Sequence, residues 1–299
     1  MPFTSAAAWR KARSFHHSRY GVELLQARRQ RVSVCLPARN CATTVGAIVA
    51  TLVGLCERDL IDEVVVIDGD SEDDTARLAA AAGATVHRES DLISETGPVL
   101  GKGDAMWRSL SVLDGDLICF LDADGEQFSS HYVNGLLGPL LELEQVDFVK
   151  AFYRRPFRVG EVAVADGGGR VNHLLARPAL AIFYPELAGF DQPLAGEIAA
   201  RRSLLERIPF TTGYGVEIAM LLDAYAEVSL DGMAQVDLDF HNNRHQPLLA
   251  LSSMAYEVLG VLAARLEREG RLSGFEPGPL LGRAAPRPSL ERPPMLARR

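Results

Sequence analysis

Short apolar runs rich in β-branched residues alternate along the first half of the chain with segments whose apolar positions recur every three or four residues. The first pattern is typical of buried strands, and the second is typical of helices that cover them. Their alternation predicts an α/β fold built around a central sheet. The predicted strands are 32–36, 63–67, 84–87 and 117–121, and the predicted helices are 45–55, 71–82 and one that begins near 104.

Single residues mark where these elements end. Pro37 lacks the N–H that a sheet ladder needs, so it predicts the end of the first strand. A threonine at 43 or 44 is the expected N-cap of the first helix, and Gly83 is the expected end of the second. The glycine-bounded stretch 97–103 predicts a mobile loop.

The pattern loosens after residue 145, which divides the chain into halves 31–145 and 146–268. The last thirty residues contain six prolines and little periodicity, so 269–299 is interpreted as an arm that is disordered or wraps a partner subunit. Residues 1–30 form a basic N-terminal arm. The second half is expected to hold an extended segment at 146–153, helices at 171–184, 196–207 and 215–227, and a last strand at 234–240.

The charge balance excludes one class of partner. The 299 residues carry 31 Lys plus Arg against 39 Asp plus Glu, a formal charge of −8, which is the wrong sign for a nucleic-acid-binding protein. The basic residues concentrate at the two ends, so the middle of the chain is strongly acidic. An acidic middle either binds cations or keeps the protein soluble.

The cysteines and the apolar runs bear on the compartment. Cys35, Cys41, Cys56 and Cys119 show no CxxC pairing, so neither a disulfide framework nor a zinc site is indicated, and a cytoplasmic location is expected. No leader-like apolar region follows the basic N-terminus, and no run approaches 18 apolar residues. Secretion and a membrane span are therefore not expected.

Polar residues follow three of the four predicted strands, those at 32–36, 63–67 and 117–121, and such strand ends are where open α/β sheets bind their ligands. Arg39 and Asn40 follow the first strand, and Asp68 follows the second. Asp122 and Asp124, one residue apart after the most apolar strand, can present oxygens to one Mg²⁺ or Mn²⁺. The alternative is an acidic turn exposed to water.

Two glycine-rich segments could contact anions. Lys102, between two glycines, could close over a phosphate, but it lacks the spacing of a phosphate-binding loop, so a surface lysine in a flexible loop is the default interpretation from these residues alone. The glycines at 167–169 permit an anion-binding nest in which Arg170 grips a phosphate or carboxylate, or they form a plain loop.

Three further residues are candidates. His241 and His245 follow the last predicted strand and could supply a metal ligand or a phosphate donor, although an isolated histidine is more often structural. Glu217 lies near the predicted start of a helix, whose dipole favours a carboxylate there, and a helix-capping role is the alternative.

Taken together, these segments resemble the glucosyl-3-phosphoglycerate synthases, which are retaining glycosyltransferases of the GT-A fold with a closely related mannosyl-3-phosphoglycerate synthase branch. The resemblance runs in order from about residue 31 to 250. It implies a Rossmann-like nucleotide-sugar-binding half with a mixed sheet, 31–145, fused to a smaller acceptor-binding half, 146–268. The matching motifs are at 36–40, 66–71, 101–110, 120–124, 149–156, 167–171, 192–197 and 212–218.

The resemblance also implies roles for single residues. In this family the 2-hydroxyl of the acceptor attacks the anomeric carbon from the face that the diphosphate leaves. The residues implied to bind the nucleotide sugar are Pro37, Ala38, Arg39, Asn40, Asp68, Gly69, Lys102, Asp122 and Ala123, and those implied to bind the metal, Mg²⁺ or Mn²⁺, are Asp122, Asp124 and His241. The residues implied to bind the acceptor are Gly169, Arg170, Asn172, Tyr214 and His245. The groups implied at the reacting centre are Lys102, Glu217 and the Leu194 backbone.

The chain departs from the family pattern at a few positions. The family's metal-binding histidine, counted from the following Pro-Leu pair, falls at Asn243, and His241 and His245 lie two residues to either side. Along an extended chain two residues restore the same side, so either histidine could reach the metal. Asn172 stands where the family has threonine, and Cys41 stands where it has an acidic residue.

The expected activity is transfer of glucose from UDP-glucose to the 2-hydroxyl of 3-phosphoglycerate, giving the precursor of a glycerate-linked compatible solute. GDP-mannose is the second candidate donor. Two other functions fit the same motifs, namely a GT-A transferase with a lipid-linked or larger acceptor and a non-catalytic nucleotide-sugar-binding protein. The apolar stretch 251–266 suits either a homodimer surface or the core.

Overall fold

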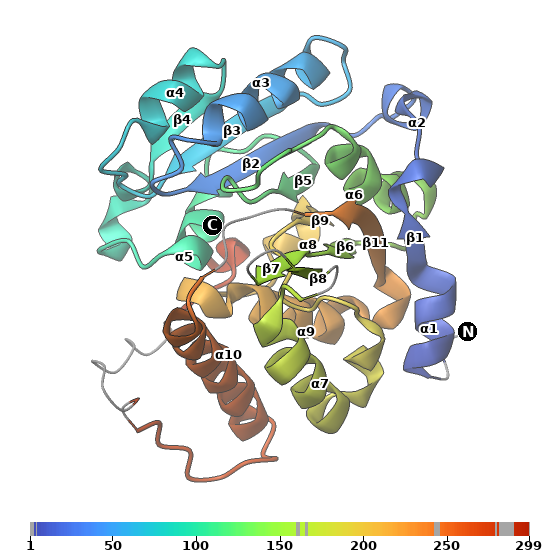
Figure 1. Ribbon diagram of the computed structural model, residues 1–299, viewed down its shortest axis with the longest axis vertical. Helices are drawn as coiled ribbons and strands as arrows, with labels where there is room; N and C mark the ends of the chain where they lie inside the picture. Colours follow the sequence, from blue (N-terminus) through green and yellow to red (C-terminus); the bar gives the residue numbers. More distant parts are fainter. Residues whose placement is uncertain are drawn as a thin grey trace.

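An eight-stranded mixed sheet runs through the centre of the computed structural model (Figure 1), which describes residues 3, 5–159, 162–164, 167–241, 246–278, 280 and 290–298. Strand β9 runs antiparallel to both of its neighbours, and the other paired strands of this sheet are parallel. In spatial order the strands are β1 (Ser14–His16), β11 (Met233–Phe240), β6 (Phe148–Arg154), β9 (Ile198–Arg201), β5 (Leu117–Phe120), β2 (Val32–Ala38), β3 (Glu63–Asp68) and β4 (Thr85–Arg88).

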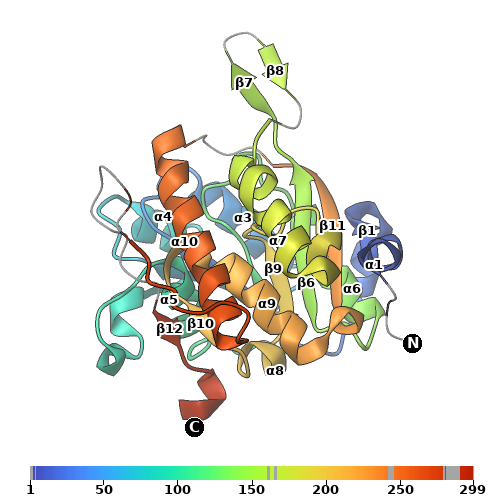
Figure 2. The same cartoon turned by 90° about the horizontal axis from the view of Figure 1, so that it is seen from below.

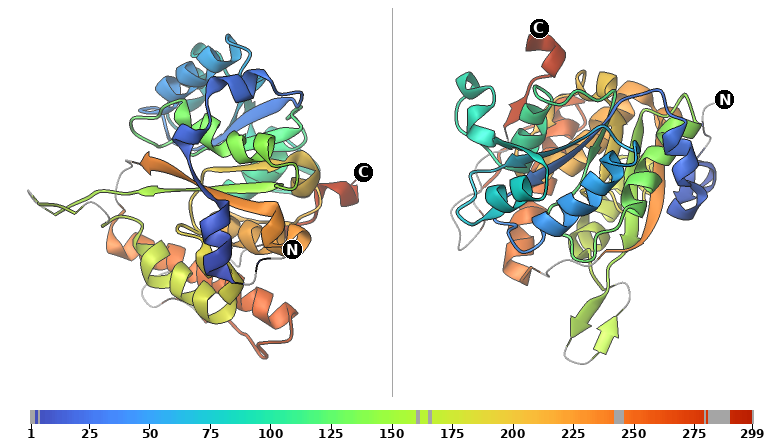
Figure 3. Two further views of the ribbon diagram at one scale, coloured as in Figure 1. Left: turned by 90° about the vertical axis from the view of Figure 1, so that its right-hand side faces the viewer. Right: turned by 90° about the horizontal axis from the view of Figure 1, so that it is seen from above.

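Helices cover both faces of this sheet, so its apolar strands are buried on two sides. The left panel of Figure 3 shows the sheet nearly edge-on between the two helical layers. One face packs against α2 (Val22–Gln26), α3 (Val45–Cys56), α4 (Thr75–Ala81) and α6 (His131–Glu142), and the other packs against α1 (Ala6–Arg13), α5 (Lys102–Ser109), α7 (Arg177–Phe183), α8 (Arg202–Leu205), α9 (Val216–Val228) and α10 (Leu248–Arg268).

Shorter elements complete the fold. The hairpin of β7 (Phe157–Val159) and β8 (Val162–Val164) projects from the body of the molecule (Figure 2). Strand β10 (Phe210–Thr211) pairs with β12 (Glu291–Arg292) near the C-terminus. The 3₁₀ turns are η1 (His17–Arg19), η2 (Glu89–Asp91), η3 (Ser94–Thr96), η5 (Pro185–Gly189), η6 (Gly213–Gly215), η7 (Leu230–Gly232) and η8 (Met295–Arg298), and η4 (Asn172–Ala176) is a π-helical turn that leads into α7.

The α/β fold predicted from the alternation is confirmed, and most predicted elements are present within a few residues of their expected bounds. The prediction that Pro37 ends the first strand is wrong, because β2 continues to Ala38. Pairing with β5 stops at Cys35, whose carbonyl accepts from the N–H of Leu121. Pro37 lies on the side of β2 where pairing with β5 has already ended, so no hydrogen bond of the sheet is lost through its missing N–H. On the other side, β2 still pairs with β3.

The helix predicted at 196–207 is also wrong. Residues Ile198–Arg201 form β9, the antiparallel strand at the middle of the sheet, and only the four residues of α8 that follow are helical. Alanine, arginine and leucine favour a helix locally. Burial between β5 and β6 overrides this preference, because two strands already present unpaired backbone groups on either side.

Two helix starts differ from expectation. Helix α4 begins at Thr75 rather than at 71, and α5 begins at Lys102, so Lys102 lies in the first turn of a helix instead of in a loop. Thr44 occupies the N-cap position of α3, as predicted, but its hydroxyl donates to the carbonyl of Ala123 at 2.6 Å instead of capping the helix. This bond ties α3 to the residues that follow β5.

The two ends of the chain are not arms separate from the core. Trp9 of α1 is fully buried, and β1 is the edge strand paired with β11. The interpretation of 269–299 as disordered or wrapped around a partner is contradicted by its described part. There β12 pairs within the same chain and Met295 is buried. By length and composition alone α10 could cross a membrane, although its Arg265 pairs with Asp223 at 2.5 Å.

Candidate active site

The carboxyl ends of β2, β3 and β5 lie side by side, because β2 is flanked by the other two strands. Polar residues at these three ends are therefore brought to one edge of the sheet. This edge holds most of the residues that the sequence singled out for a nucleotide sugar and a metal. They are Pro37, Ala38, Arg39 and Asn40 at and after the end of β2, Asp68 and Gly69 at and after the end of β3, and Asp122, Ala123 and Asp124 after the end of β5.

Behind the end of β3 lies a polar recess. Asp68 is buried, and its Oδ1 has no hydrogen-bond partner among the described residues. The N–H of Gly69 donates to the carbonyl of Ala38 at 2.8 Å, and a side chain at Gly69 would meet Glu89 and Arg39. A buried carboxylate oxygen without a partner is costly, so this recess is suited to a ligand that donates hydrogen bonds.

Glu89 belongs to the same recess and was missed by the sequence analysis. It is buried, its Oε1 is unpaired among the described residues, and burial together with the nearby Asp104 carboxylate raises the pKa of Glu89 to about 8. Glu89 directly follows β4, the next strand along the sheet. The strand-end rule that selected Asp68 and Asp122 would have found it.

Two of the predicted nucleotide-binding residues help to shape the backbone here. Asn40 has a φ of 55°, its N–H donates to Ser71 Oγ at 3.0 Å, and its Oδ1 accepts from the N–H of Glu72 at 3.0 Å. These bonds join the loops after β2 and β3. Ala123 presents its carbonyl to Thr44. The turns that carry Arg39 and Asp124 are thereby held in place.

Lys102 is the central cation of the site. Its Nζ contacts Oδ1 of Asp122 and lies 2.8 Å from Oε1 of Glu217, so it bridges one carboxylate that follows β5 and one in α9. Burial opposes the charged form of Lys102, but the two carboxylates outweigh it and raise its pKa well above the usual value. The structure thus brings together three residues that lie far apart in the sequence.

Gly196 is a second residue that the sequence analysis missed. A β-carbon at this position would overlap the carboxylate of Asp122, so only glycine lets the backbone before β9 pass the aspartate. Its neighbour Glu197 is buried and accepts a hydrogen bond from the hydroxyl of Tyr153 at 2.8 Å. The segment before β9 is therefore packed directly against the carboxylate of Asp122.

The donor set fits a hard divalent cation. Asp122 and His241 line one small recess together with Gly125, and the buried Nε2 of His241 has no partner among the described residues. Partial desolvation and the adjacent Asp122 carboxylate raise the pKa of Asp124, although part of its surface is exposed to solvent. Two crowded carboxylates and an imidazole nitrogen without a partner are donor groups of the kind that hold such an ion.

The other side of the His241 ring is held by aromatic residues. Nδ1 of His241 lies 3.1 Å from the hydroxyl of Tyr132, and the ring of Tyr153 stacks on it with centroids 4.6 Å apart. A hydrogen bond at Nδ1 fixes the orientation of the imidazole and leaves Nε2 as the nitrogen without a partner among the described residues. Asn243 and His245, the other candidates for this ligand position, lie outside the described residues.

The residues predicted to bind the acceptor lie on a different group of elements. Asn172, which is buried in η4, accepts a hydrogen bond from the backbone N–H of Leu194 at 2.8 Å. Gly169 has a φ of 65°, and Nη2 of Arg170 donates to the carbonyl of Gln246 at 2.7 Å. Tyr214 in η6 exposes about half of its side chain.

A pocket of about 160 Å³ opens beside Gly168, which adjoins this acceptor group. A side chain at Gly168 would clash with Arg155. Four basic side chains and two acidic ones line the pocket, which suits a small anion. The charged lining residues are Arg154, Arg155, His173, Arg177, Asp191 and Asp237.

Lys150 is a buried lysine that the sequence analysis assigned no role. It lies in the middle of β6, is fully inaccessible, and its Nζ donates to the carbonyl of Ala195 at 2.8 Å. It thereby holds the segment that carries Leu194 and Gly196. Burial lowers the pKa of Lys150 to about 7, and the nearby Glu217 partly opposes this shift.

This burial predicts a pH dependence of stability. The free energy of unfolding of the wild type, relative to Lys150→Met, is expected to increase as the pH rises from 7 to 10. At a pH between the lowered pKa of Lys150 in the folded protein and its ordinary pKa, this lysine is protonated in the unfolded chain but mostly neutral in the folded one. Raising the pH therefore favours the folded state, by at most about 1.4 kcal/mol per pH unit. Urea midpoints of both proteins at pH 7 and at pH 10 measure it, and an unchanged difference would contradict it.

Comparison with known proteins places the whole arrangement in one family. Residues 33–178 match the model of glycosyl transferase family 2. The glucosyl-3-phosphoglycerate synthase of Petrotoga mobilis is 44% identical over 268 residues, 87% of this chain and 82% of that relative. The crystal structure of mannosyl-3-phosphoglycerate synthase from Rubrobacter xylanophilus has a TM-score of 0.91 at 44% identity and covers 100% of both chains.

A third similar protein has been solved with ligands. The glucosyl-3-phosphoglycerate synthase of Mycobacterium tuberculosis with Mn²⁺, UDP-glucose and phosphoglyceric acid has a TM-score of 0.81 at 39% identity, and the match covers 93% of this chain and 94% of that one. Another structure of that enzyme holds Mg²⁺ and UDP. The polar residues at the strand ends, the two carboxylates bridged by Lys102 and these matches all indicate the same family. The chain belongs to the family of glucosyl- and mannosyl-3-phosphoglycerate synthases, which are hexosyltransferases with the GT-A fold.

Proposed function

We propose that this enzyme transfers glucose from UDP-glucose to the 2-hydroxyl of 3-phosphoglycerate, with retention at the anomeric carbon, and so forms the precursor of a glycerate-linked compatible solute. The observation that carries the proposal is the convergence of Lys102, Asp122 and Glu217 beside His241, which lines the same small recess as Asp122. The relative from P. mobilis, at 44% identity, supports glucose as the sugar.

The chain's own residues supply binding, orientation and fixed charge. Asp122, Asp124 and His241 would hold the divalent cation, which when bound neutralises charge on the diphosphate. Lys102 places a second cation at the same edge, where fixed electrostatics lowers the barrier most. Glu217, kept next to Lys102 at 2.8 Å, is positioned to accept a hydrogen bond from a hydroxyl group.

The acceptor would lie toward the second half of the chain. The glycine turn at 167–169 with Arg170, and the backbone of Leu194 fixed by Asn172, form its expected binding surface. In the reaction a bond forms between the 2-oxygen and the anomeric carbon, the bond from that carbon to the diphosphate oxygen breaks, and UDP and a proton are released. The basic pocket beside Gly168 suits an acceptor with phosphate and carboxylate groups.

GDP-mannose is the second candidate donor, and the match to the R. xylanophilus mannosyl enzyme, with a TM-score of 0.91, is the observation that favours it. Release of nucleotide from each donor, with and without 3-phosphoglycerate, separates the two. UDP release from UDP-glucose that depends on 3-phosphoglycerate is expected. Faster GDP release from GDP-mannose under the same conditions would reassign the donor.

The same measurement tests the acceptor. Turnover only with a lipid-linked or larger acceptor would identify a different GT-A transferase. Binding of nucleotide and metal with no turnover and no slow hydrolysis of either donor would identify a non-catalytic nucleotide-sugar-binding protein. Neither of these two proteins would be stimulated by 3-phosphoglycerate.

We further propose a homodimer in the cytoplasm. Leu248, Leu249 and Leu259 of α10 are exposed and could bury apolar surface against a second copy, and all four cysteines are free, which suits a reducing compartment. Light scattering gives the molar mass in solution that decides the oligomeric state.

A further inference from the structure

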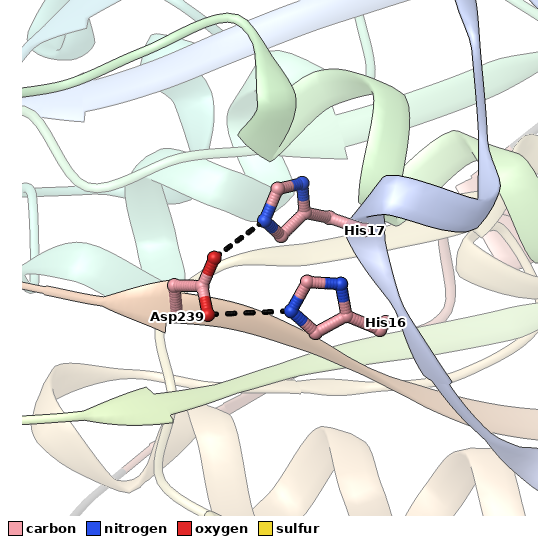
Figure 4. Close-up of side chains that lie close together, drawn as sticks. All are labelled: His16, His17 and Asp239. Carbon is pink, nitrogen blue, oxygen red and sulfur yellow. Dashed lines mark hydrogen bonds and ion pairs between the residues drawn. The ribbon is translucent and has the colours of Figure 1, made fainter.

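A second cluster of metal-ligand residues lies at the opposite edge of the sheet from β4, outside the site described above. His16 and His17 come from the junction of β1 and η1, and Asp239 comes from the end of β11 (Figure 4). The possible ligand atoms of these three residues all lie within 4.8 Å of one another. Among the described residues, no other group of three histidines, cysteines or acids is this close.

Without an ion, the two histidine rings are hydrogen-bonded to the carboxylate of Asp239. Nε2 of His16 lies 3.2 Å from Oδ1 of Asp239, and Nε2 of His17 lies 2.7 Å from Oδ2. Ligands bonded to one tetrahedral Zn²⁺ are about 3.3 Å apart. Small adjustments of these side chains would therefore place three ligands around one ion and leave a fourth position open to water.

The backbone of Asp239 is arranged to present its carboxylate here. Asp239 has a φ of 67°, which is uncommon for a residue other than glycine, and it lies where the register of β11 against β6 shifts. Its N–H donates to Asp237 Oδ1 at 2.9 Å. A bulge with a left-handed residue redirects a side chain out of the regular strand pattern, and here it directs the carboxylate toward the two histidines.

The surroundings support the imidazole rings. Nδ1 of His16 lies 2.7 Å from Ser18 Oγ, the kind of outer contact that orients a ligating histidine. Nδ1 of His16 also accepts a hydrogen bond from the N–H of Ser18 at 3.2 Å. This bond would be lost on metal binding, because a ring that binds a metal through Nε2 carries its proton on Nδ1. The ring of His17 packs against His131 with centroids 4.3 Å apart. One contact opposes a metal, because Nη2 of Arg154 lies 3.0 Å from Oδ1 of Asp239.

From this arrangement we propose that His16, His17 and Asp239 form a second metal site, selective for Zn²⁺ or a similar transition-metal ion. Two imidazole nitrogens and one carboxylate suit zinc, whereas Mg²⁺ prefers oxygen ligands. The ion would join the N-terminal edge strand to β11 two residues before His241. It would therefore clamp β1 to the strand that leads into the active site.

The test is calorimetric titration of the full-length protein with Zn²⁺ near neutral pH, in excess Mg²⁺ that competes with Zn²⁺ for the active-site aspartates. One tight equivalent is expected for the wild type and for the matched control His87→Ala, whose histidine lies on β4 at the far edge of the sheet. His17→Gln is expected to bind at least about tenfold more weakly, because it loses one of three ligands.

Arg154→Gln provides a second variant that does not depend on removing a ligand. It is expected to bind Zn²⁺ more tightly than the wild type, because the competing cation next to Asp239 is gone. Thermal melting shows whether each variant is folded. No zinc binding by the wild type, equal binding by His17→Gln, or unchanged or weaker binding by Arg154→Gln would overturn the proposal, and none of these results would affect the glycosyltransferase assignment.

Discussion

Substitution of Asp124 by alanine is expected to reduce the rate of sugar transfer by a factor on the order of 10² to 10³, the usual loss when one electrostatic element of a catalytic site is removed. Asp124 shares its position after β5 with Asp122, and its carboxylate is not needed to neutralise Lys102, which already contacts Asp122 and Glu217. The loss should therefore reflect metal and diphosphate binding rather than folding.

The matched control is Asp114→Ala, because Asp114 lies on the surface before the amino end of β5, away from the site. It should retain wild-type activity. Both variants should keep the thermal midpoint of the wild type, and Asp124→Ala should need more Mn²⁺ for half-maximal rate. Full activity of Asp124→Ala at saturating metal would refute the assigned role.

Substitution of Arg292 by methionine is expected to cost about 3 kcal/mol of unfolding free energy, although Arg292 lies in the proline-rich C-terminal segment. Its guanidinium binds the fully buried carboxylate of Asp104 through two bonds of 2.7 and 2.9 Å. Removing one partner of a buried ion pair typically costs about 3–5 kcal/mol. The lower end applies because Arg108 remains 3.2 Å from Asp104.

Urea unfolding measures this cost. The control is Arg298→Met, whose partner Glu95 is mostly exposed, so that change should cost roughly 0–1 kcal/mol. Equal stability of the two variants would contradict the prediction. Because Asp104 lies in α5 two residues after Lys102, Arg292→Met should also lower activity by loosening the first turn of that helix.

Strand-end chemistry is what the sequence predicted best. Apolar runs identified β2, β3 and β5, and parallel strands end at the same edge, so Asp68 and Asp122 had to lie near each other. The ordered motifs further indicated the family, which the comparisons confirmed. None of this required knowledge of how the second half of the chain packs.

The positions of β9, Gly196 and Lys150 could not be predicted in the same way. The local sequence of Ile198–Arg201 favours a helix, and only the gap between β5 and β6 makes it a strand. Glycine is required at position 196 because the carboxylate of Asp122 lies against it. Lys150 has a structural role because its Nζ donates to the carbonyl of Ala195. Neither contact can be inferred from the residues next to them in the sequence. Likewise, the pairing of Arg292 with Asp104 joins residues 188 positions apart.

The sequence by itself therefore determined the α/β architecture, the family and the acidic strand end, because each is encoded in neighbouring residues or in a fixed alternation of strand and helix. The tertiary structure alone decided which cation meets which carboxylate, that both ends of the chain join the core, and that His16 and His17 face Asp239. These contacts depend on packing between distant segments, and local propensity contains no information about such contacts.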